Sequence, residues 1–352
     1  MNEGGDTMAS IKDVARLAGV SPSTVSLAMN GSPLVKHETR YRIMQAVEEL
    51  NYKPNQAARS LVTKEKKVIG LFLLSGEESL TDFSQPFSHT QDTLLVEMLP
   101  FVQKTLREAD YSILVDLFFS GPQTEHPENH QLNRNSIDGA IFFGGLVNEI
   151  QLQNIHNTKV PSVLVCSRDN NLDYVDTDPK EGIRLATQYL IQNGHHHIAL
   201  LNGSDRSQVS ARKLAGYRQA LEENGISYDE SLVESSAGSG DHALSAIEKL
   251  WDRVPHPTAI ITASEYTGCA ALRFLYDRGL SCPDDVSVIS FGDGPVTAYT
   301  APALTTINLH KQRLGEEAAN ILINRLKNPK ARQVELIIPP ELTIRDSVKC
   351  IL

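Results

Sequence analysis

The stretch SIKDVARLAGVSPSTVSLAMN, residues 10–30, predicts two short helices joined by a tight turn. Ser10 stands three residues before Asp13, which is the spacing of a capping box for a helix that begins at Ile11. From Ile11 onward apolar residues recur at i, i+3, i+4 and i+7, so the helix has one apolar face. Gly19 can adopt the left-handed conformation that ends such a helix.

The second helix is predicted to start at Ser21 and Pro22, as N-cap and first-turn residues. Val25, Ala28 and Met29 are predicted to face inward. The outer side then carries Pro22, Ser23, Thr24, Ser26 and Leu27. A helix that exposes short polar side chains at its N-terminal end can enter the major groove of DNA.

A third helix is predicted from about Lys36 to Leu50, with apolar residues spaced to cover the first two. On geometry alone, any small three-helix bundle is an alternative to a helix-turn-helix. Residues 8–67 hold ten Lys or Arg and five Asp or Glu, a net charge of +5, whereas the whole chain has a net charge of -10 and its remainder therefore -15. Positive charge confined to this segment favours a polyanionic partner bound there.

The composition favours a soluble cytoplasmic protein of two or three domains, since 352 residues is long for a single core. The four cysteines form no CxxC pair, so we expect neither a disulfide framework nor a metal site. Residues 1–7 are predicted to be a disordered leader. No signal peptide and no membrane-spanning run is apparent, and no cofactor is expected.

Beyond residue 67, strand-like apolar runs alternate with helical stretches. Their continuous apolar character is typical of parallel strands that helices cover on both faces. The runs span residues 68–74, 112–119, 138–144, 161–167, 197–203, 258–263 and 286–292. We therefore predict an α/β body of two doubly wound parallel-sheet subdomains, with a ligand cleft between them at the carboxyl ends of the strands.

Three runs, IKDVARLAGVSPSTVS, NGSPLVKHETR and NYKPNQAARSL, resemble the N-terminal signature of the lactose-repressor/galactose-repressor (LacI/GalR) family of bacterial transcription factors. The rest of the chain is similar to that family's periplasmic-binding-protein-like body. The resemblance implies a headpiece at 8–54, a hinge at 55–67 and a body at 68–352. We expect an N-subdomain of about 68–168 and 294–326, and a C-subdomain of about 169–293 and 327–352.

The resemblance implies a ligand-controlled regulator, most simply a repressor, that binds a near-palindromic operator as a homodimer. Contacts to double-stranded DNA are expected from Ser10, Ile11, Ser21, Pro22, Ser23, Thr24, Ser26, Leu27, Asn30, Tyr52, Asn55, Ala58, Arg59 and Leu61. Family members commonly have arginine where this chain has Leu27. A leucine can touch a thymine methyl group, so the half-site should differ from common family operators.

The hinge segment from Asn55 to Leu61 is too short to be a stable helix in water. The residues alone favour a flexible linker. The resemblance instead implies a helix that orders on the operator and drives Leu61 into the minor groove at the central base step, next to Arg59.

For the small-molecule effector, the resemblance implies contacts from Phe87, Arg168, Asp178, Arg212, Lys213, Ser264, Glu265 and Asp293. Two alternatives remain open: Phe87 can be an ordinary core residue, and Asp178 can be the N-cap of a helix that begins at Pro179. We expect a carbohydrate or sugar derivative as the effector.

The chain departs from the family pattern at the expected effector site. Lys213 replaces an arginine, so the planar fork for bidentate binding is lost there. Ser264 and Glu265 replace an Asn-Asp pair, and Gly292 replaces the first of two aspartates, of which Asp293 is the second. A larger glycoside, a phosphorylated sugar or a non-sugar metabolite therefore remains possible as the effector.

Two other functions compete with this interpretation. A solute-binding protein of a transporter is disfavoured by the basic headpiece and by the missing signal peptide. An enzyme on an α/β fold is disfavoured because no pairing of nucleophile and base stands out in the sequence.

The hinge hypothesis predicts that Leu61→Ala loses most of the operator affinity, because the minor-groove wedge is removed, while effector binding is unchanged. A mobility-shift titration measures the first quantity and calorimetry the second. Operator binding equal to that of the unsubstituted protein would refute the wedge role.

Overall fold

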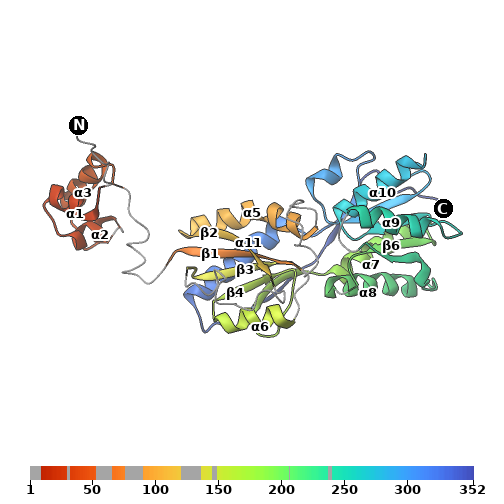
Figure 1. Ribbon diagram of the computed structural model, residues 1–352, viewed down its shortest axis with the longest axis horizontal. Helices are drawn as coiled ribbons and strands as arrows, with labels where there is room; N and C mark the ends of the chain where they lie inside the picture. Colours follow the sequence, from red (N-terminus) through yellow and green to blue (C-terminus); the bar gives the residue numbers. More distant parts are fainter. Residues whose placement is uncertain are drawn as a thin grey trace. The chain divides into compact units, whose positions relative to one another are not determined.

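The computed structural model describes residues 9–29, 32–52, 66–75, 90–119, 136–144, 149–205, 207–236 and 240–352. The chain forms two compact units, Met1–Lys66 and Lys67–Leu352 (Figure 1). The described part of the first unit is helical, and the second unit is built from two mostly parallel sheets covered by helices. The predicted fold class, an all-α headpiece followed by an α/β body, is thereby confirmed.

The first unit packs three helices around a small apolar core. They are α1 (Ile11–Ala18), α2 (Pro22–Met29) and α3 (His37–Glu49). Val14, Val25 and Ile43, one from each helix, are fully buried. The periodicity read from the sequence therefore places the correct side chains inside.

The second unit contains two lobes. The sheet of the first lobe has the strand order β11-β5-β4-β3-β1-β2, and all its pairs are parallel. Its strands are β1 (Val68–Ser75), β2 (Ser112–Phe119), β3 (Gly139–Phe143), β4 (Ser162–Val165), β5 (Asp173–Thr177) and β11 (Glu335–Ile338).

Helices α5 (Thr90–Glu108) and α11 (Lys311–Lys327) cover one face of this sheet, and α6 (Glu149–Thr158) covers the other (Figure 1). The alternation of side chains along β1 produces this layering. Ile69 and Leu71 belong to the buried cluster that includes residues of α5 and α11, whereas Phe72 packs with Ile155 of α6. Since both faces are apolar, the strand reads as a continuous hydrophobic run.

The sheet of the second lobe has the order β12-β10-β9-β8-β6-β7, and its one antiparallel pair is β10 with β12. Its strands are β6 (Ile198–Asn202), β7 (Val233–Ser235), β8 (Ala259–Thr262), β9 (Ser287–Phe291), β10 (Thr305–Asn308) and β12 (Glu341–Thr343). Helices α7 (Pro179–Gln192) and α8 (Gln208–Glu223) lie on one face, with α9 (Gly240–Trp251) and α10 (Glu265–Asp277) on the other.

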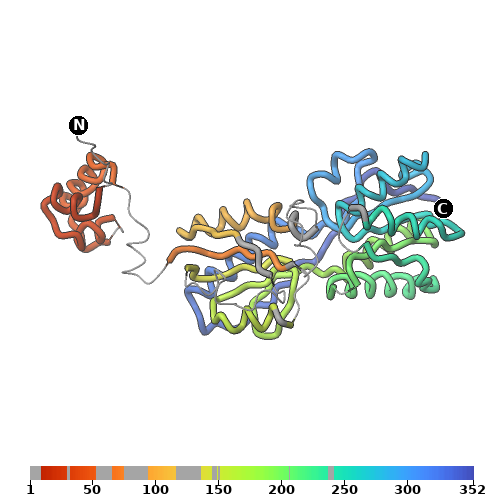
Figure 2. Tube along the Cα trace, in the orientation of Figure 1, coloured from red at the N-terminus to blue at the C-terminus, as the bar shows by residue number. Residues whose placement is uncertain are grey.

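The chain crosses between the lobes at positions that differ from the predicted boundaries. The first crossing follows β5, at residue 178 rather than at 168–172, because β5 pairs with β4 in the first sheet. The second follows β10, near residue 309 rather than at 294–305, because β10 pairs with β9. The third follows β11, near residues 339–340 rather than after 327. In Figure 2 the blue C-terminal part of the chain accordingly runs through both lobes.

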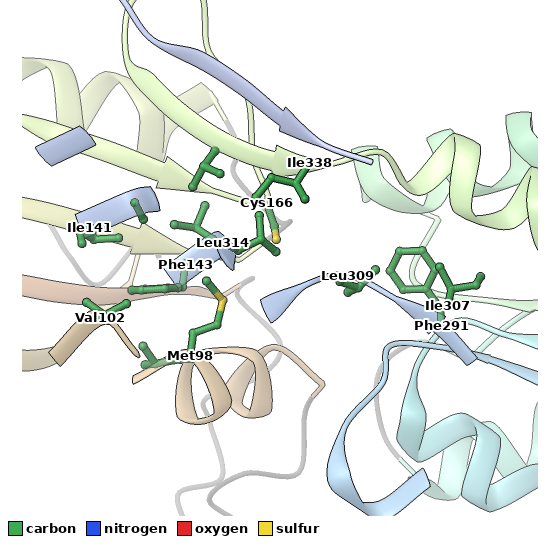
Figure 3. Close-up of a cluster of buried hydrophobic side chains, with 14 of the residues drawn as sticks. Met98, Val102, Ile141, Phe143, Cys166, Phe291, Ile307, Leu309, Leu314 and Ile338 are labelled. Carbon is green, nitrogen blue, oxygen red and sulfur yellow. The ribbon is translucent and has the colours of Figure 1, made fainter. Parts of the chain in front are cut away.

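The buried apolar cluster continues across the second crossing. Figure 3 shows Met98, Phe143 and Leu314 of the first lobe on one side, and Phe291 and Ile307 of the second lobe on the other. Leu309, which directly follows β10, lies between the two groups in this view and is 7% exposed. This crossing is therefore anchored by apolar packing where the chain passes from one lobe to the other.

Candidate functional site

The N-terminus of α1 is fixed by the predicted pair of Ser10 and Asp13. The backbone N–H of Ser10 donates to the Asp13 carboxylate at 3.0 Å, and its hydroxyl donates to the same oxygen at 2.6 Å. These bonds from Ser10 lower the pKa of Asp13. Gly19, with φ of 64°, ends the helix in the left-handed conformation that the turn requires.

Helix α2 starts as the sequence predicts, because the Ser21 hydroxyl accepts a hydrogen bond from the Thr24 N–H at 3.1 Å. Its inner side is held by Val25 and Ala28, which are buried. The positions expected to face DNA divide by exposure: Ser21, Pro22, Ser23 and Leu27 are exposed, and Thr24 and Ser26 are half-buried. The helix therefore presents its N-terminal end and one apolar side chain to solvent.

Two expected DNA contacts also pack on the headpiece core. Ile11 and Tyr52 are half-buried against the cluster formed by α1, α2 and α3. Contacts of these side chains with DNA remain predictions. Asn30, Asn55, Ala58, Arg59 and Leu61 lie outside the described residues, as does Phe87 of the effector set.

In the second unit, two arginines meet one buried carboxylate where the lobes face each other. Asp176, at the end of β5, is 1% exposed. Its Oδ2 accepts from Arg168 Nε at 2.6 Å and from Arg212 Nη1 at 2.9 Å. Arg212 stands on α8 of the second lobe, whereas Asp176 belongs to the first sheet, so this pair joins the lobes.

Asp178 is the N-cap of α7 in the structure, the second of the two roles considered for it. Its Oδ1 accepts from the N–H groups of Lys180 at 3.1 Å and Glu181 at 3.4 Å. It also lies 3.7 Å from Nη2 of Arg212, at the rim of the same cluster. A contact with an effector stays a prediction for Asp178.

Lys213 is buried inside the second lobe, with 6% of its surface exposed. Its Nζ donates to the carbonyl of Ala263 at 2.8 Å and lies 3.7 Å from the centroid of the Phe291 ring. Burial lowers the pKa of Lys213 to about 7, although the nearby Glu265 acts in the opposite direction. The amine of Lys213, at the position where the family pattern has arginine, is therefore only about half protonated near pH 7.

Ser264 and Glu265 open helix α10. The Ser264 hydroxyl accepts from the N–H of Thr267, so this residue is a helix cap. Glu265 accepts from Lys311 Nζ at 2.5 Å, and Lys311 also reaches Glu97 at 2.6 Å. Since Lys311 and Glu97 belong to α11 and α5, this triad is a second ionic link between the lobes.

The exchange at Gly292 explains the position of the Glu265 carboxylate. A Cβ on Gly292 would lie 2.3 Å from Oε1 of Glu265, and Gly292 has φ of +102°. The carboxylate of Glu265 thus fills the space that a side chain at 292 would occupy. The departures from the family pattern at 265 and 292 therefore meet at one place, where the longer glutamate takes up the space that the missing side chain at 292 leaves free.

Asp293 is occupied by internal partners. It accepts from Arg345 Nη2 at 2.6 Å and from the hydroxyl of Thr306 at 2.8 Å. Burial alone would raise the pKa of Asp293, but the bonds from Arg345 and Thr306 outweigh it and the pKa is lowered. Asp293 therefore joins the C-terminal segment to β10, and an effector contact from it remains a prediction.

A small cavity of about 90 Å³, open to solvent, lies beside the Asp176 cluster. Its walls come from both lobes: the segment after β4 and helix α6 on one side, and the first turns of α8 on the other. The lining residues are Leu152, Cys166, Ser167, Arg168, Gln208, Val209 and Arg212. Two of the expected effector residues, Arg168 and Arg212, are thus brought together.

Sequence reasoning missed three charged residues that join the lobes: Asp176, Glu97 and Lys311. Asp176 stands two residues before Asp178 in the motif VDTD, so the signal was present but was assigned to its neighbour. Glu97 and Lys311 lie in ordinary amphipathic helices more than 200 residues apart. No local pattern marks them.

The fold and these sites define a class: a helix-turn-helix headpiece joined to a two-lobed body with a cavity between the lobes. A family model described as bacterial regulatory proteins, lacI family, matches residues 10–55, and one described as a periplasmic binding protein-like domain matches residues 187–348. The HTH-type transcriptional regulator CelR of Thermobifida fusca is 32% identical over 95% of this chain and 96% of its own length.

The HTH-type transcriptional repressor PurR of Vibrio campbellii is 30% identical, covering 97% of this chain and 99% of its own. A solved structure of a transcriptional regulator CelR–cellobiose complex aligns with a TM-score of 0.70 and 29% identity, over 96% of this chain and 99% of that one. The chain belongs to the LacI family of bacterial regulatory proteins. It is a DNA-binding transcriptional regulator and not an enzyme, as predicted.

The described part of the chain contains neither a membrane-spanning helix nor a cluster of metal ligands. None of the helices there is long and apolar enough to cross a membrane. No group of three or more His, Cys, Asp or Glu within the same ranges could hold a metal ion.

The buried amine of Lys213 predicts a particular pH dependence of stability. The unfolded chain keeps this proton up to the ordinary pKa of 10.5, whereas the folded chain loses it near 7. The lysine therefore destabilises the fold increasingly as the pH falls from about 10 to about 7, and its effect is constant below that.

Lys213→Met keeps the apolar stem and removes the amine. The melting temperature of this variant, relative to the unsubstituted protein, should be higher at pH 7 than at pH 9 by a few degrees. Lys104→Met, at an exposed position of α5, is the control and should show no such change. An equal difference at both pH values for Lys213→Met would contradict a lowered pKa.

Proposed function

We propose that this protein binds a near-palindromic operator as a homodimer in the cytoplasm, and that a small molecule bound between the lobes controls its affinity for that operator. The effector is a carbohydrate or a sugar derivative. Phosphate contacts from the basic headpiece make operator binding fall steeply with salt concentration.

One observation carries the proposal: two residues expected to contact the effector also form the ionic links between the lobes. Arg212 pairs with Asp176 beside the cavity, and Glu265 pairs with Lys311 at a second contact between the lobes. A ligand that binds either side chain competes with an inter-lobe ion pair or reinforces it. It therefore has different affinities for different lobe arrangements, which is the condition for shifting their populations.

The headpiece supports sequence-specific binding. Leu27 is 41% exposed on α2, beside the exposed residues Pro22 and Ser23. An apolar side chain among short polar ones fits contact with a thymine methyl group in the major groove.

The carbohydrate class is supported by the relative whose solved structure is described as a CelR–cellobiose complex. The lysine at 213 and the departures at positions 265 and 292 make this chain's site different from the family pattern. A larger glycoside or a phosphorylated sugar is therefore included in the proposed class.

The first test is selection of duplexes by the purified protein from a random pool, with and without a panel of sugars and sugar phosphates. We expect a near-palindromic sequence to be enriched. A thermal-shift screen of the same panel, repeated with the selected duplex, identifies the effector. If no duplex is enriched under any condition, the proposed function is wrong.

The second test is the variant Leu27→Ala, which removes the thymine contact. Affinity for the selected duplex should fall by a factor of about 5 to 30, or ~1–2 kcal/mol, and affinity for unrelated DNA should not change. Met44→Ala, at an exposed apolar position of α3 with 49% exposure, is the control and should bind both as the unsubstituted protein does. A uniform loss on all DNA would contradict base readout by Leu27.

A further inference from the structure

The charge balance of the cavity between the lobes is uneven. Arg168 and Arg212 both donate to the same oxygen of Asp176. One buried carboxylate thus faces two guanidinium groups, and both of these line the cavity. The residues that line it within the described ranges include no Asp or Glu.

A second carboxylate, that of Asp178, offsets part of this charge at the rim of the cluster but does not line the cavity. Asp178 lies 3.7 Å from Arg212, beyond hydrogen-bond distance, and its Oδ1 is already shared by two N–H groups at the start of α7. Arg212 has one further acceptor, the carbonyl of Thr177 at 3.3 Å. For Arg168, the only acceptor recorded within the described part of the chain is Asp176. Each guanidinium carries five N–H donors, so several remain for a ligand.

Neutral groups complete the lining. Ser167 and Gln208 add a hydroxyl and an amide, and Gln208 and Val209 are the first two residues of α8. The N–H groups of a helix's first turn have no partner inside the helix, and this end of the helix carries partial positive charge. The helix end thus adds to the positive potential that the two arginines create.

We propose that this cavity binds an oxyanion, so that the effector is a small sugar-like molecule carrying a carboxylate or a phosphate group. A guanidinium matches the geometry of either group with two parallel hydrogen bonds. A neutral sugar bound here would displace water from the two guanidinium groups without supplying a counter-charge, which is unfavourable. The inference rests on the proposed function, since it names the chemistry of the effector in the same cleft.

The test is thermal unfolding of the full chain, without DNA, at constant ionic strength set with sodium chloride. The three probes are inorganic phosphate, glucuronate and glucose. When the anion concentration is about ten times its dissociation constant, binding should raise the melting temperature of the protein by about 2 to 4 °C. We expect this shift with phosphate, with glucuronate or with both, and none with glucose.

Arg168→Gln is the test variant, because Arg212 continues to pair with the buried Asp176. The anion-dependent shift should disappear. Arg184→Gln is the matched control: Arg184 is 21% exposed, bonds to Glu181 and Glu223, and does not line the cavity. It should keep the full shift. A shift with phosphate alone assigns a phosphate ester, and a shift with glucuronate alone assigns a sugar acid.

Two results would overturn the inference: neither anion stabilises the protein more than sodium chloride does, or the stabilisation survives in Arg168→Gln. A neutral sugar that alters operator binding while no anion binds would reject the inference and leave the proposed function intact. Failure to enrich any duplex would reject the proposed function, and it would not affect the outcome of the anion measurement.

Discussion

The amine of Lys311 lies between two carboxylates, and this triad is the interaction on which the arrangement of the lobes depends. Lys311 and Glu97 belong to the first lobe and Glu265 to the second. Burial alone would lower the pKa of Lys311, but Glu265 and Glu97 raise it above its ordinary value, so the amine stays charged. Removing one member of a buried ionic group leaves an uncompensated charge, which costs about 3–5 kcal/mol.

The triad and the Asp176 cluster are separate ionic contacts between the lobes. In each, a residue of the second lobe at the start of a helix reaches a charged residue of the first lobe. The apolar packing around Leu309 joins the lobes at a crossing and is non-directional. The ion pairs, in contrast, form only when the charged groups are close together. A change in lobe orientation is therefore opposed mainly by interactions that a charged or polar ligand can replace.

Much of the fold follows from local patterns. The caps at Ser10 and Ser21 depend on partners three residues away, and buried parallel strands read as apolar runs. Strand β5, DYVDT, was missed because it carries Asp173 and Asp176, which are 4% and 1% exposed. Each of them has a partner that is distant in the chain, Arg325 for Asp173 and Arg212 for Asp176. Since the missed strand ends at the cleft, the predicted lobe boundaries were displaced as well.

The site residues that could be predicted are those that lie in a recognisable local motif. Arg168, Arg212 and Glu265 were found through resemblance to a family motif. The carboxylate at 176 and the pair Glu97 and Lys311 depend on contacts between segments that only the folded chain brings together. The sequence also does not show that the Glu265 carboxylate occupies the space beside Gly292, because only the folded chain brings these two residues together.

The most direct test of the account measures the distance between the lobes. Spin labels at residues 104 and 222, exposed positions on α5 and α8, report this distance in a chain whose exposed Cys350 is replaced by serine. If the triad fixes the arrangement of the lobes, Lys311→Met should shift and broaden the distance distribution, because Glu97 and Glu265 then repel each other. Arg273→Met removes the exposed ion pair Arg273–Asp277 within α10 and should leave the distance distribution unchanged. An identical distribution in Lys311→Met and the unsubstituted protein would contradict the account.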